Sequence, residues 1–395
     1  MRTIICDLTR DQLAATGVPF DEAVCREELL AARDCTGCFG CWVRTPGRCV
    51  LPDSLCDLPS LVARTDELWL FSANAFGGLS PLVKRALERS IGYLHPGFRV
   101  TGGALHHRLR SDRAPSLRVW LYGPSSETER ACLGRIAEAN ATNLGATLGR
   151  VRFPGDWRDA GGEKDGPVVD PPAPPESRVS APPRRVALVN ASPRGDGSAT
   201  AHLLGDLAEA LGVYARMANM NAPELVDVPC PRAGAVDAGE LSGCDSVLLG
   251  YPLYVDAPPS GLVDLLVRWR DSVEPGTRVY ALANMGFYEP EQILPSFLVI
   301  ENFCAAAGAR WMGGVAVGGG GMTLATEGTP RMGMLRRPVS EAIDRLIAAI
   351  RSGTGAGVDP VRPAVPRLVY RLAAEAQWRR MARESGADLD AAPWL

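Results

Sequence analysis

One stretch of the second half constrains the fold most, because it reads as a strand, a tight loop and a helix in immediate succession. The aliphatic run at 186–190 (VALVN) leads into ASPRGDGSAT at 191–200, and a helical pattern follows at 201–212. Such a unit brings the backbone N–H groups of a helix N-terminus to the end of a strand. It predicts a sheet of parallel strands that binds its ligand at the carboxyl ends of those strands.

The alternation of strand and helix continues along the chain and also occurs in the first half. In the second half we expect strands at 224–228, 245–250, 278–283 and 311–317, and helices at 258–271, 290–307 and 336–352. In the first half we expect strands near 2–7, 67–72 and 117–122, and helices near 80–93 and 126–144. The fold class is therefore α/β, with two doubly wound parallel-sheet domains, and the repeated pattern indicates an internal duplication.

Composition marks the domain boundaries. Prolines, glycines and charged residues dominate 154–185, which we expect to be an extended linker between domains at 1–153 and 186–355. The remaining segment, 356–395, is predicted to be a C-terminal extension. Within it, Leu368, Leu372 and Trp378 lie among several arginines, which predicts a basic amphipathic helix docked on its own domain or on a partner.

The loop after the first strand of the second half has the chemistry of a phosphate site. Ser192, Ser198 and Thr200 supply hydroxyl groups, and Arg194 supplies positive charge. The helix N-terminus adds unpaired N–H groups and the positive end of the helix dipole. A phosphomonoester fits these donors. The alternative is that the serine before the helix only caps it and the glycines make a turn, which leaves the Ser-Pro-Arg sequence unexplained.

The composition is ordinary for a globular protein and gives no electrostatic reason to expect nucleic acid. Hydrophobic residues make up 46% of the 395 residues, charged residues 22%, and the formal net charge is -3. No apolar run reaches the roughly 20 residues of a membrane span, and no N-terminal stretch has the pattern of a signal peptide. We therefore expect a cytoplasmic protein that binds neither nucleic acid nor a membrane.

Four of the eleven cysteines form a C-x2-C-x2-C-x7-C run, made of Cys35, Cys38, Cys41 and Cys49. Thiolates at this spacing can ligate a [4Fe–4S] cluster, hold a structural zinc ion, form a redox-active pair, or simply pack. A bend at the Pro-Gly pair before the last cysteine favours four ligands over a lone pair. The other seven are expected to be small buried hydrophobes: Cys6, Cys25, Cys56, Cys132, Cys230, Cys244 and Cys304.

These motifs resemble those of a known family. The loop Ser192-Pro193-Arg194 with Ser198 and Thr200 resembles the GSPR-x-x-S-x-T phosphate loop of the NADPH-dependent FMN reductase and flavodoxin-like superfamily. The turns at 251–254 (YPLY) and 284–289 (NMGFYE) resemble that family's two flavin-ring loops. The run CTGCFGCW at 35–42 resembles the iron–sulfur flavoproteins, a branch in which such cysteines hold a [4Fe–4S] cluster.

The resemblance implies an FMN-dependent oxidoreductase or electron-transfer flavoprotein, with FMN in the second domain and a [4Fe–4S] cluster on the first. The donor would be NAD(P)H or a ferredoxin-type protein, the acceptor a small molecule or a protein, and a homodimer is left open. No residue stands out as a general acid or base, which agrees with flavin chemistry, because the cofactor performs the transfer. The implied cofactor-binding residues are Ser192, Arg194, Ser198, Ala199, Thr200, Pro252, Leu253, Tyr254, Asn284 and Gly286, and the implied cluster ligands are Cys35, Cys38, Cys41 and Cys49.

Alternatives remain at this point. Tyr254 could pack over the following helix and Asn284 could close a turn instead of contacting the flavin ring. The first half has no Ser-Pro-Arg turn between its opening strand and Cys35, so it is not expected to bind FMN in the usual manner. Two other functions stay open: a cluster-free NAD(P)H-dependent FMN or quinone reductase, and a non-catalytic interaction protein built from worn flavodoxin-like domains.

Overall fold

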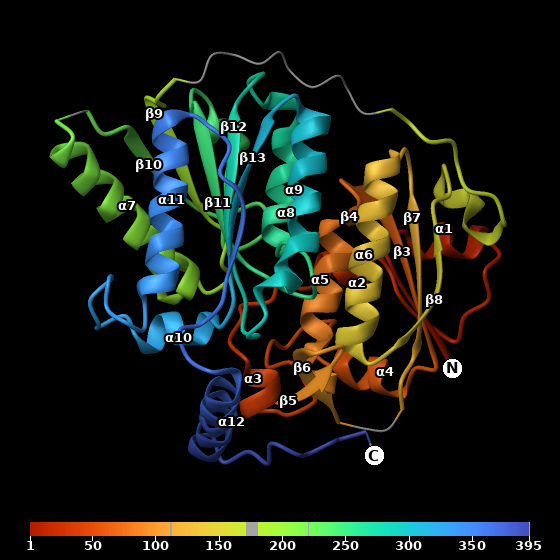
Figure 1. Cartoon of the computed structure of the whole chain (residues 1–395). Helices are drawn as coiled ribbons and strands as arrows, with labels where there is room; N and C mark the ends of the chain where they lie inside the picture. The colour runs from red at the N-terminus through yellow and green to blue at the C-terminus, as the bar shows by residue number, and fades with distance from the viewer. Residues whose placement is uncertain (111–112, 171–180, 220, 395) are drawn as a thin grey trace. The chain divides into compact units, whose positions relative to one another are not determined.

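The computed structural model describes residues 1–110, 113–170, 181–219 and 221–394, shown in Figure 1. The chain divides into two compact units. The first comprises Met1–Asp170 together with Arg371–Leu395, and the second comprises Pro171–Tyr370. Each unit is built around its own parallel sheet.

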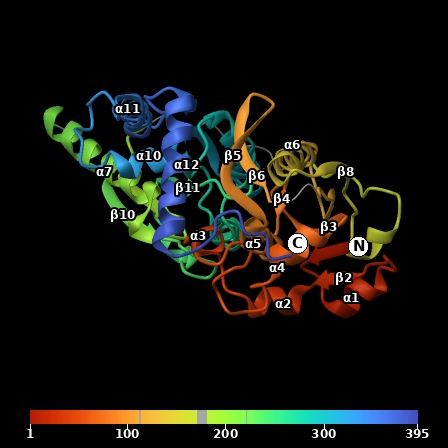
Figure 2. The ribbon, with the colours of Figure 1, turned by 90° about the horizontal axis from the view of Figure 1, so that it is seen from below.

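The sheet of the first unit has the strand order β2-β1-β3-β7-β8, and all four pairings along this path are parallel. A short strand, β4, pairs antiparallel with β3, and β5 and β6 form a separate antiparallel ribbon (Figure 2). The bounds are β1 (Arg2–Cys6), β2 (Glu22–Val24), β3 (Glu67–Ala75), β4 (Gly78–Leu79), β5 (Leu94–Thr101), β6 (Ala104–Leu109), β7 (Ser116–Tyr122) and β8 (Thr147–Arg152).

The sheet of the second unit has the order β10-β9-β11-β12-β13-β14, again with parallel pairings throughout. The bounds are β9 (Arg185–Asn190), β10 (Glu224–Pro229), β11 (Ser246–Pro252), β12 (Arg278–Asn284), β13 (Arg310–Val317) and β14 (Gly357–Val361). When only the strands along each parallel path are numbered, the first sheet has the order 2-1-3-4-5 of flavodoxin-like folds, and the second has the same order followed by a sixth strand. The prediction of two flavodoxin-like doubly wound domains is confirmed.

Helices connect successive strands. Those that begin in the first unit are α1 (Arg10–Ala15), α2 (Arg26–Ala31), α3 (Gly40–Val43), α4 (Leu58–Arg64), α5 (Pro81–Ser90) and α6 (Glu127–Leu144), with 3-10 turns η1 (Ile91–Tyr93) and η2 (Trp157–Gly161). Those that begin in the second unit are α7 (Ala199–Met217), α8 (Ser260–Trp269), α9 (Leu294–Ala307), α10 (Gly320–Ala325), α11 (Arg337–Ser352) and α12 (Arg367–Glu384), with η3 (Gly195–Gly197), η4 (Ala238–Leu241), η5 (Arg270–Ser272) and η6 (Pro290–Ile293). No helix among the described residues is long and apolar enough to cross a membrane.

The core of the second unit explains why its phosphate-loop helix is firmly placed. Every residue of β11 is buried, as expected of a central parallel strand covered on both faces. Helix α7 packs beside α11 over this sheet (Figures 1 and 2). Leu203 and Leu207 of α7 and Ile343 of α11 belong to the same core cluster, and all three are 0–1% exposed. Each such side chain stabilises the fold by about 1.5–3 kcal/mol relative to exposure.

Two segments differ from the expected domain plan. Residues 154–170 were expected to begin an extended linker, but they contact the first unit: Gly123 N donates to Pro154 O (3.0 Å), and Arg130 donates to Gly166 O (2.7 Å). Residues 171–180 of the predicted linker lie outside the described residues. The predicted C-terminal extension begins with β14, which adds a sixth strand to the second sheet.

Candidate functional site

The predicted phosphate loop follows β9 and leads into α7. Ser198 is the N-cap of α7, and its hydroxyl accepts a hydrogen bond from Ala201 N (3.0 Å). Ser192 is 1% exposed, and its hydroxyl accepts from Arg194 N (3.3 Å), which closes the turn. The strand order changes direction between β9 and β11, and flavodoxin-like folds bind their ligand at this switch point.

The N-terminus of α7 retains unused donors. The first N–H groups of a helix have no partner within it. One of them, Ala201 N, is capped by Ser198, whereas Ala199 N and Thr200 N have no hydrogen-bond partner in the part of the chain that the structure describes. The two amides lie close to Ser192 and Ser198 in the chain, and free amides at a helix N-terminus are groups that bind anions in proteins.

Asn284, at the end of β12, is tied to this helix. Its Nδ2 donates to Thr200 Oγ1 (2.7 Å) and to Tyr251 O (3.4 Å), and the side chain is 4% exposed. The structure thus brings together two residues predicted for different parts of the site. Through these contacts the amide of Asn284 joins the N-terminus of α7 to the end of β11. The contact of Asn284 with a flavin ring stays a prediction.

The loop after β11 has an unusual backbone. Val255 and Asp256 have φ values of +44° and +56°, in the left-handed region that β-branched residues avoid. The loop is held at both sides: Leu253 N donates to Asn284 O (2.7 Å), and Tyr254 bridges to Ala257. Strained backbone that is fixed by its surroundings is typical of ligand-binding loops.

The loop after β12 is shaped by glycines that follow β13. Gly318 approaches it so closely that a Cβ there would lie 2.3 Å from Tyr288 O, and Gly319 N donates to Phe287 O (2.6 Å). From the other side, the hydroxyl of Tyr370 on α12 donates to Gly286 O (2.6 Å). The carbonyl oxygen of Gly286, a predicted site residue, is therefore already hydrogen-bonded. The space beside its α-carbon is open, since a Cβ there would meet no atom within 4 Å.

The corresponding position of the first unit is built differently. Only three residues separate β1 from α1. Thr9 and Gln12 form a capping box in which Thr9 Oγ1 accepts from Gln12 N (3.1 Å), and Arg10 N donates to Glu27 (3.3 Å). Asp7 adds a buried carboxyl group, which accepts from Ala73 N (2.9 Å) and Tyr122 (2.7 Å). Burial raises the pKa of Asp7. The first domain accordingly lacks the phosphate loop, as predicted.

The four cysteines of the run occupy a loop between α2 and α4. Cys35 and Cys38 lie in its irregular part, Cys41 lies in the short helix α3, and Cys49 follows a tight turn. Two sulfurs accept backbone hydrogen bonds: Cys35 Sγ from Gly37 N (3.5 Å) and Cys38 Sγ from Gly40 N (3.4 Å).

The sulfurs lie near enough to influence one another. Burial raises the pKa of Cys35 to about 12, with further increases from Glu88, Cys49 and Cys38. Burial also raises the pKa of Cys41 well above its usual value, and the other three thiols of the run add to the effect. The fold therefore gathers the four thiols within electrostatic reach of one another, and the two most buried, Cys35 and Cys41, are held in the neutral form.

The sulfurs of the run do not form a ready-made site for a single zinc ion in the part of the chain that the structure describes. A tetrahedral ion with Zn–S bonds of about 2.3 Å needs sulfurs about 3.8 Å apart. Among the described residues, the ligand atoms of Cys25, Glu27 and Glu28 all lie within 4.8 Å of one another. The sulfurs of the cysteine run do not form such a group. Glu28 in that group pairs with Arg10 (2.6 Å) and accepts from Cys25 N (2.9 Å), so a helix cap explains it without an ion.

Aromatic side chains cover one side of the cysteine loop. Phe39, whose φ is +56°, stacks on Trp42 with ring centroids 5.3 Å apart. Trp378 of α12 meets both rings edge-on at 5.2 and 5.4 Å, and His107 lies 4.5 Å from Trp42. Leu368 and Leu372 of the same helix are 66% and 59% exposed. Docking of this helix on a partner therefore stays a prediction.

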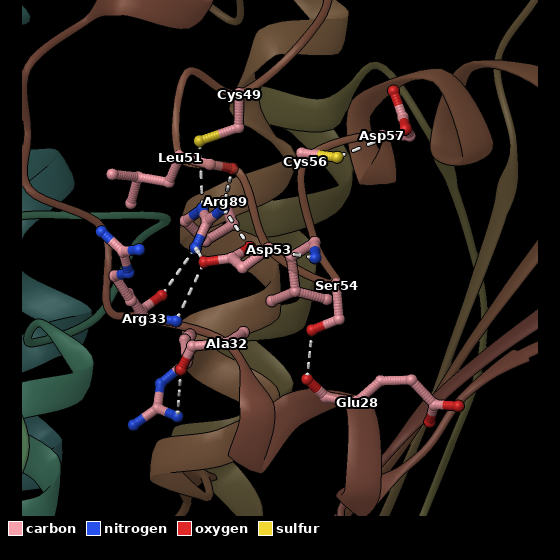
Figure 3. Close-up of polar contacts among 12 residues, drawn as sticks. Glu28, Ala32, Arg33, Cys49, Leu51, Asp53, Ser54, Cys56, Asp57 and Arg89 are labelled. Atoms are coloured by element: carbon pink, nitrogen blue, oxygen red, sulfur yellow. Dashed lines mark hydrogen bonds and ion pairs between the residues drawn. The ribbon is translucent and has the colours of Figure 1, made fainter.

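Helix α5 contributes two arginines that the sequence analysis missed. The guanidinium of Arg89 lies between Cys49, Asp53 and the Arg33 carbonyl (Figure 3). One turn earlier, Arg85 pairs with Asp34 and donates to two carbonyl oxygens of the α2 end. The only sequence signal was a run of charges on a helix next to the cysteines, which ordinarily indicates a solvated face.

The cysteines outside the run are buried with one exception. Cys56 is partly exposed, and its thiol donates to Asp57 (3.3 Å) while Arg48 lies 3.6 Å from the sulfur. The expectation of a buried hydrophobe is therefore wrong for Cys56. It is right for the other six, each 0–3% exposed: Cys6, Cys25, Cys132, Cys230, Cys244 and Cys304.

No protein-family model and no curated protein matches the chain. Among solved structures, the chain is similar to the Trp repressor binding protein from Bacillus subtilis (14% identity, TM-score 0.28, 36% of this chain and 94% of that one). It is also similar to the azoreductase AzrA (15%, 0.28, 42% and 99%) and to an NAD(P)H:quinone oxidoreductase from Methanothermobacter marburgensis (12%, 0.24, 42% and 93%). Each match spans less than half of this chain, so the fold assignment rests on the strand order.

Proposed function

We propose that the second unit binds FMN and that the protein is an FMN-dependent oxidoreductase or electron-transfer flavoprotein. The observation that carries the proposal is a pair of amides, Ala199 N and Thr200 N, that have no partner among the described residues and lie at the N-terminus of α7 beside the switch point of the sheet. Amides in this position bind phosphate oxygens, and Ser192, Ser198 and Arg194 add side-chain donors at the same loop.

The ring loops support the same ligand. A flavin needs a flat slot with backbone groups for its pyrimidine edge. The loops that begin at Pro252 and at Asn284 end neighbouring parallel strands, and Leu253 N already joins them through Asn284 O. Tyr254, Leu253 and Gly286 would contact the ring, while Asn284 would hold the two loops at a fixed separation. When bound, the flavin supplies the electron transfer, and the protein residues bind, orient and shield it.

The cysteine run is proposed to hold a [4Fe–4S] cluster through Cys35, Cys38, Cys41 and Cys49. Four free thiols around one place, with backbone N–H groups directed at two of the sulfurs, fit the donor set of such a cluster. The donor would then be NAD(P)H or a ferredoxin-type protein, with a small molecule or a protein as acceptor.

Binding measurements separate this proposal from its alternatives. Metal-free, flavin-free protein should bind FMN at least about tenfold more tightly than riboflavin, because each hydrogen bond to a charged phosphate contributes about 1.5–3 kcal/mol. Equal affinity for the two flavins would exclude the phosphate loop as the site. No binding of either flavin would favour an interaction protein without cofactor.

Iron and acid-labile sulfide assays of anaerobically purified protein test the cluster. We expect about four irons and four sulfides per chain. Cys38→Ser should lose both, whereas Cys56→Ser, a change at a partly exposed cysteine outside the run, should keep them. FMN without iron or sulfide in the unaltered protein would instead favour a cluster-free FMN or quinone reductase.

A further inference from the structure

Arg89 occupies an unusual position for a charged side chain. It lies in α5, its side chain is 0% exposed, and its guanidinium uses all its donors on the cysteine loop (Figure 3). Nε donates to Cys49 Sγ (3.1 Å). Nη1 donates to Arg33 O (2.6 Å) and Asp53 Oδ2 (3.0 Å), while Nη2 donates to Asp53 Oδ1 (2.7 Å) and Leu51 O (3.5 Å).

Asp53 completes this arrangement. It receives the two parallel bonds from Arg89 and also accepts from Arg33 N (3.1 Å) and Leu55 N (3.1 Å). The pair therefore ties the segment before the first cysteine of the run to the segment after the last. In this buried Arg–Asp pair, oxygen atoms accept all the hydrogen bonds that the two outer nitrogens of the Arg89 guanidinium donate.

The structural role of Arg89 does not require its hydrogen bond to the sulfur of Cys49. Arg85 on the same helix, one turn earlier, shows the purely structural alternative, because its bonds go to Asp34, Leu29 O and Ala32 O and none goes to sulfur. Among the residues that the structure describes, Arg89 is the one that directs a positively charged N–H at a predicted ligand atom. Hydrogen bonds to ligand sulfurs and nearby charge help to set the reduction potential of a cysteine-ligated cluster.

We propose that Arg89 is a positioning residue that orients Cys49 as the fourth ligand and raises the reduction potential of the group that the cysteine run holds. The proposal rests on the proposed function of the run. The sign follows from electrostatics: a reduced cluster carries more negative charge on its sulfurs, so a cationic N–H donor stabilises the reduced state more than the oxidised one. Asp53 limits this effect by placing a negative charge on the far side of the guanidinium.

The test compares three variants of the full chain with the unaltered protein by redox titration of the cluster. Arg89→Lys keeps the charge but loses the fork and should lower the midpoint potential. Asp53→Asn removes the countercharge and should raise it. Arg85→Lys, the matched control on the same helix, should leave it unchanged. If all three shift the potential in the same direction, or none does, the role of Arg89 is only structural and the proposal is overturned.

A second measurement tests the role of Arg89 in the case that the protein contains no cluster. If the unaltered protein contains no iron or sulfide, the proposed cluster fails, and Co2+ then serves as the probe of thiolate ligation through its sulfur charge-transfer absorption. Loss of a group that orients a metal ligand typically weakens metal binding by about 10–100-fold. Arg89→Lys should show such a loss and Arg85→Lys should not. Equal Co2+ affinity of Arg89→Lys and the unaltered protein would overturn the positioning role.

Discussion

Replacement of Ser198 by Ala separates helix capping from ligand binding at the phosphate loop. The hydroxyl of Ser198 is 4% exposed and accepts one hydrogen bond, from Ala201 N at 3.0 Å. Its own proton remains available to an anion at the adjacent amides of Ala199 and Thr200. The substitution therefore removes a cap in the free protein and a donor in the complex with FMN.

The expected losses of stability and of FMN affinity can both be given as free energies. Loss of a serine N-cap costs about 1 kcal/mol of stability. Loss of a hydrogen bond to a charged phosphate costs about 1.5–3 kcal/mol, which corresponds to roughly a 10- to 150-fold weaker FMN complex. Riboflavin, which lacks the phosphate, should bind both proteins equally well. Only the phosphate-dependent part of the affinity should change.

Ser126 offers a matched control. It caps α6 in the first unit, accepts from Glu129 N (3.2 Å) and belongs to a capping box. Ser126→Ala should therefore lower stability by a similar amount, about 1 kcal/mol, and leave FMN affinity unchanged. Fluorescence titrations with FMN and riboflavin, together with urea unfolding, measure both quantities. If Ser198→Ala binds FMN as tightly as the unaltered protein, or weakens both flavins alike, the reasoning about the loop is refuted.

Three further outcomes are expected. Burial lowers the pKa of His107 from 6.5 to about 3, so stability should be complete above pH 6.5 and fall as the pH decreases toward 3, by about 2 kcal/mol at pH 5. His107→Phe should flatten that dependence in urea unfolding, and parallel pH curves would contradict the assignment. Val255→Gly relieves about 1–2 kcal/mol of left-handed strain but adds about 0.5–1 kcal/mol of chain entropy, so thermal unfolding should show unchanged or slightly higher stability. A loss above about 1 kcal/mol would argue against strain there. Trp378→Ala removes two aromatic contacts of about 0.5–1.5 kcal/mol each and should lower stability by about 1–3 kcal/mol. Leu372→Ala, at an exposed position of the same helix, should change little, and equal losses would show that the aromatic contacts contribute nothing specific.

The long periodic elements of the fold were predictable because their patterns are local. The strand at 186–190 appears as Arg185–Asn190, and the helix expected at 336–352 appears as Arg337–Ser352. The strands β2, β4, β8 and β14 and the β5–β6 ribbon were not predicted. Their residues lack a clear alternation, and they form only because a neighbouring edge offers hydrogen-bond partners.

The candidate sites likewise contain local features that the sequence predicts and long-range contacts that it does not. Ser198 as a helix cap and the clustering of four cysteines follow from spacing along the chain, since both involve residues only a few positions apart. The link between Thr200 and Asn284 joins residues 84 positions apart, and no local pattern indicates it. The inward turn of Trp378 likewise depends on which face of its helix meets Phe39 and Trp42.

The sequence by itself determined the strand–loop–helix unit, the doubly wound fold class and the compact group of thiols, because each depends on the order and spacing of nearby residues. Only the tertiary structure decided which donors surround those groups. Arg85 and Arg89 look like part of a solvated helix face in the sequence, yet both are buried against the cysteine loop. Burial of a charge is stable only when the fold supplies its partners, here Asp34 and Asp53, and those partners lie 51 and 36 positions away.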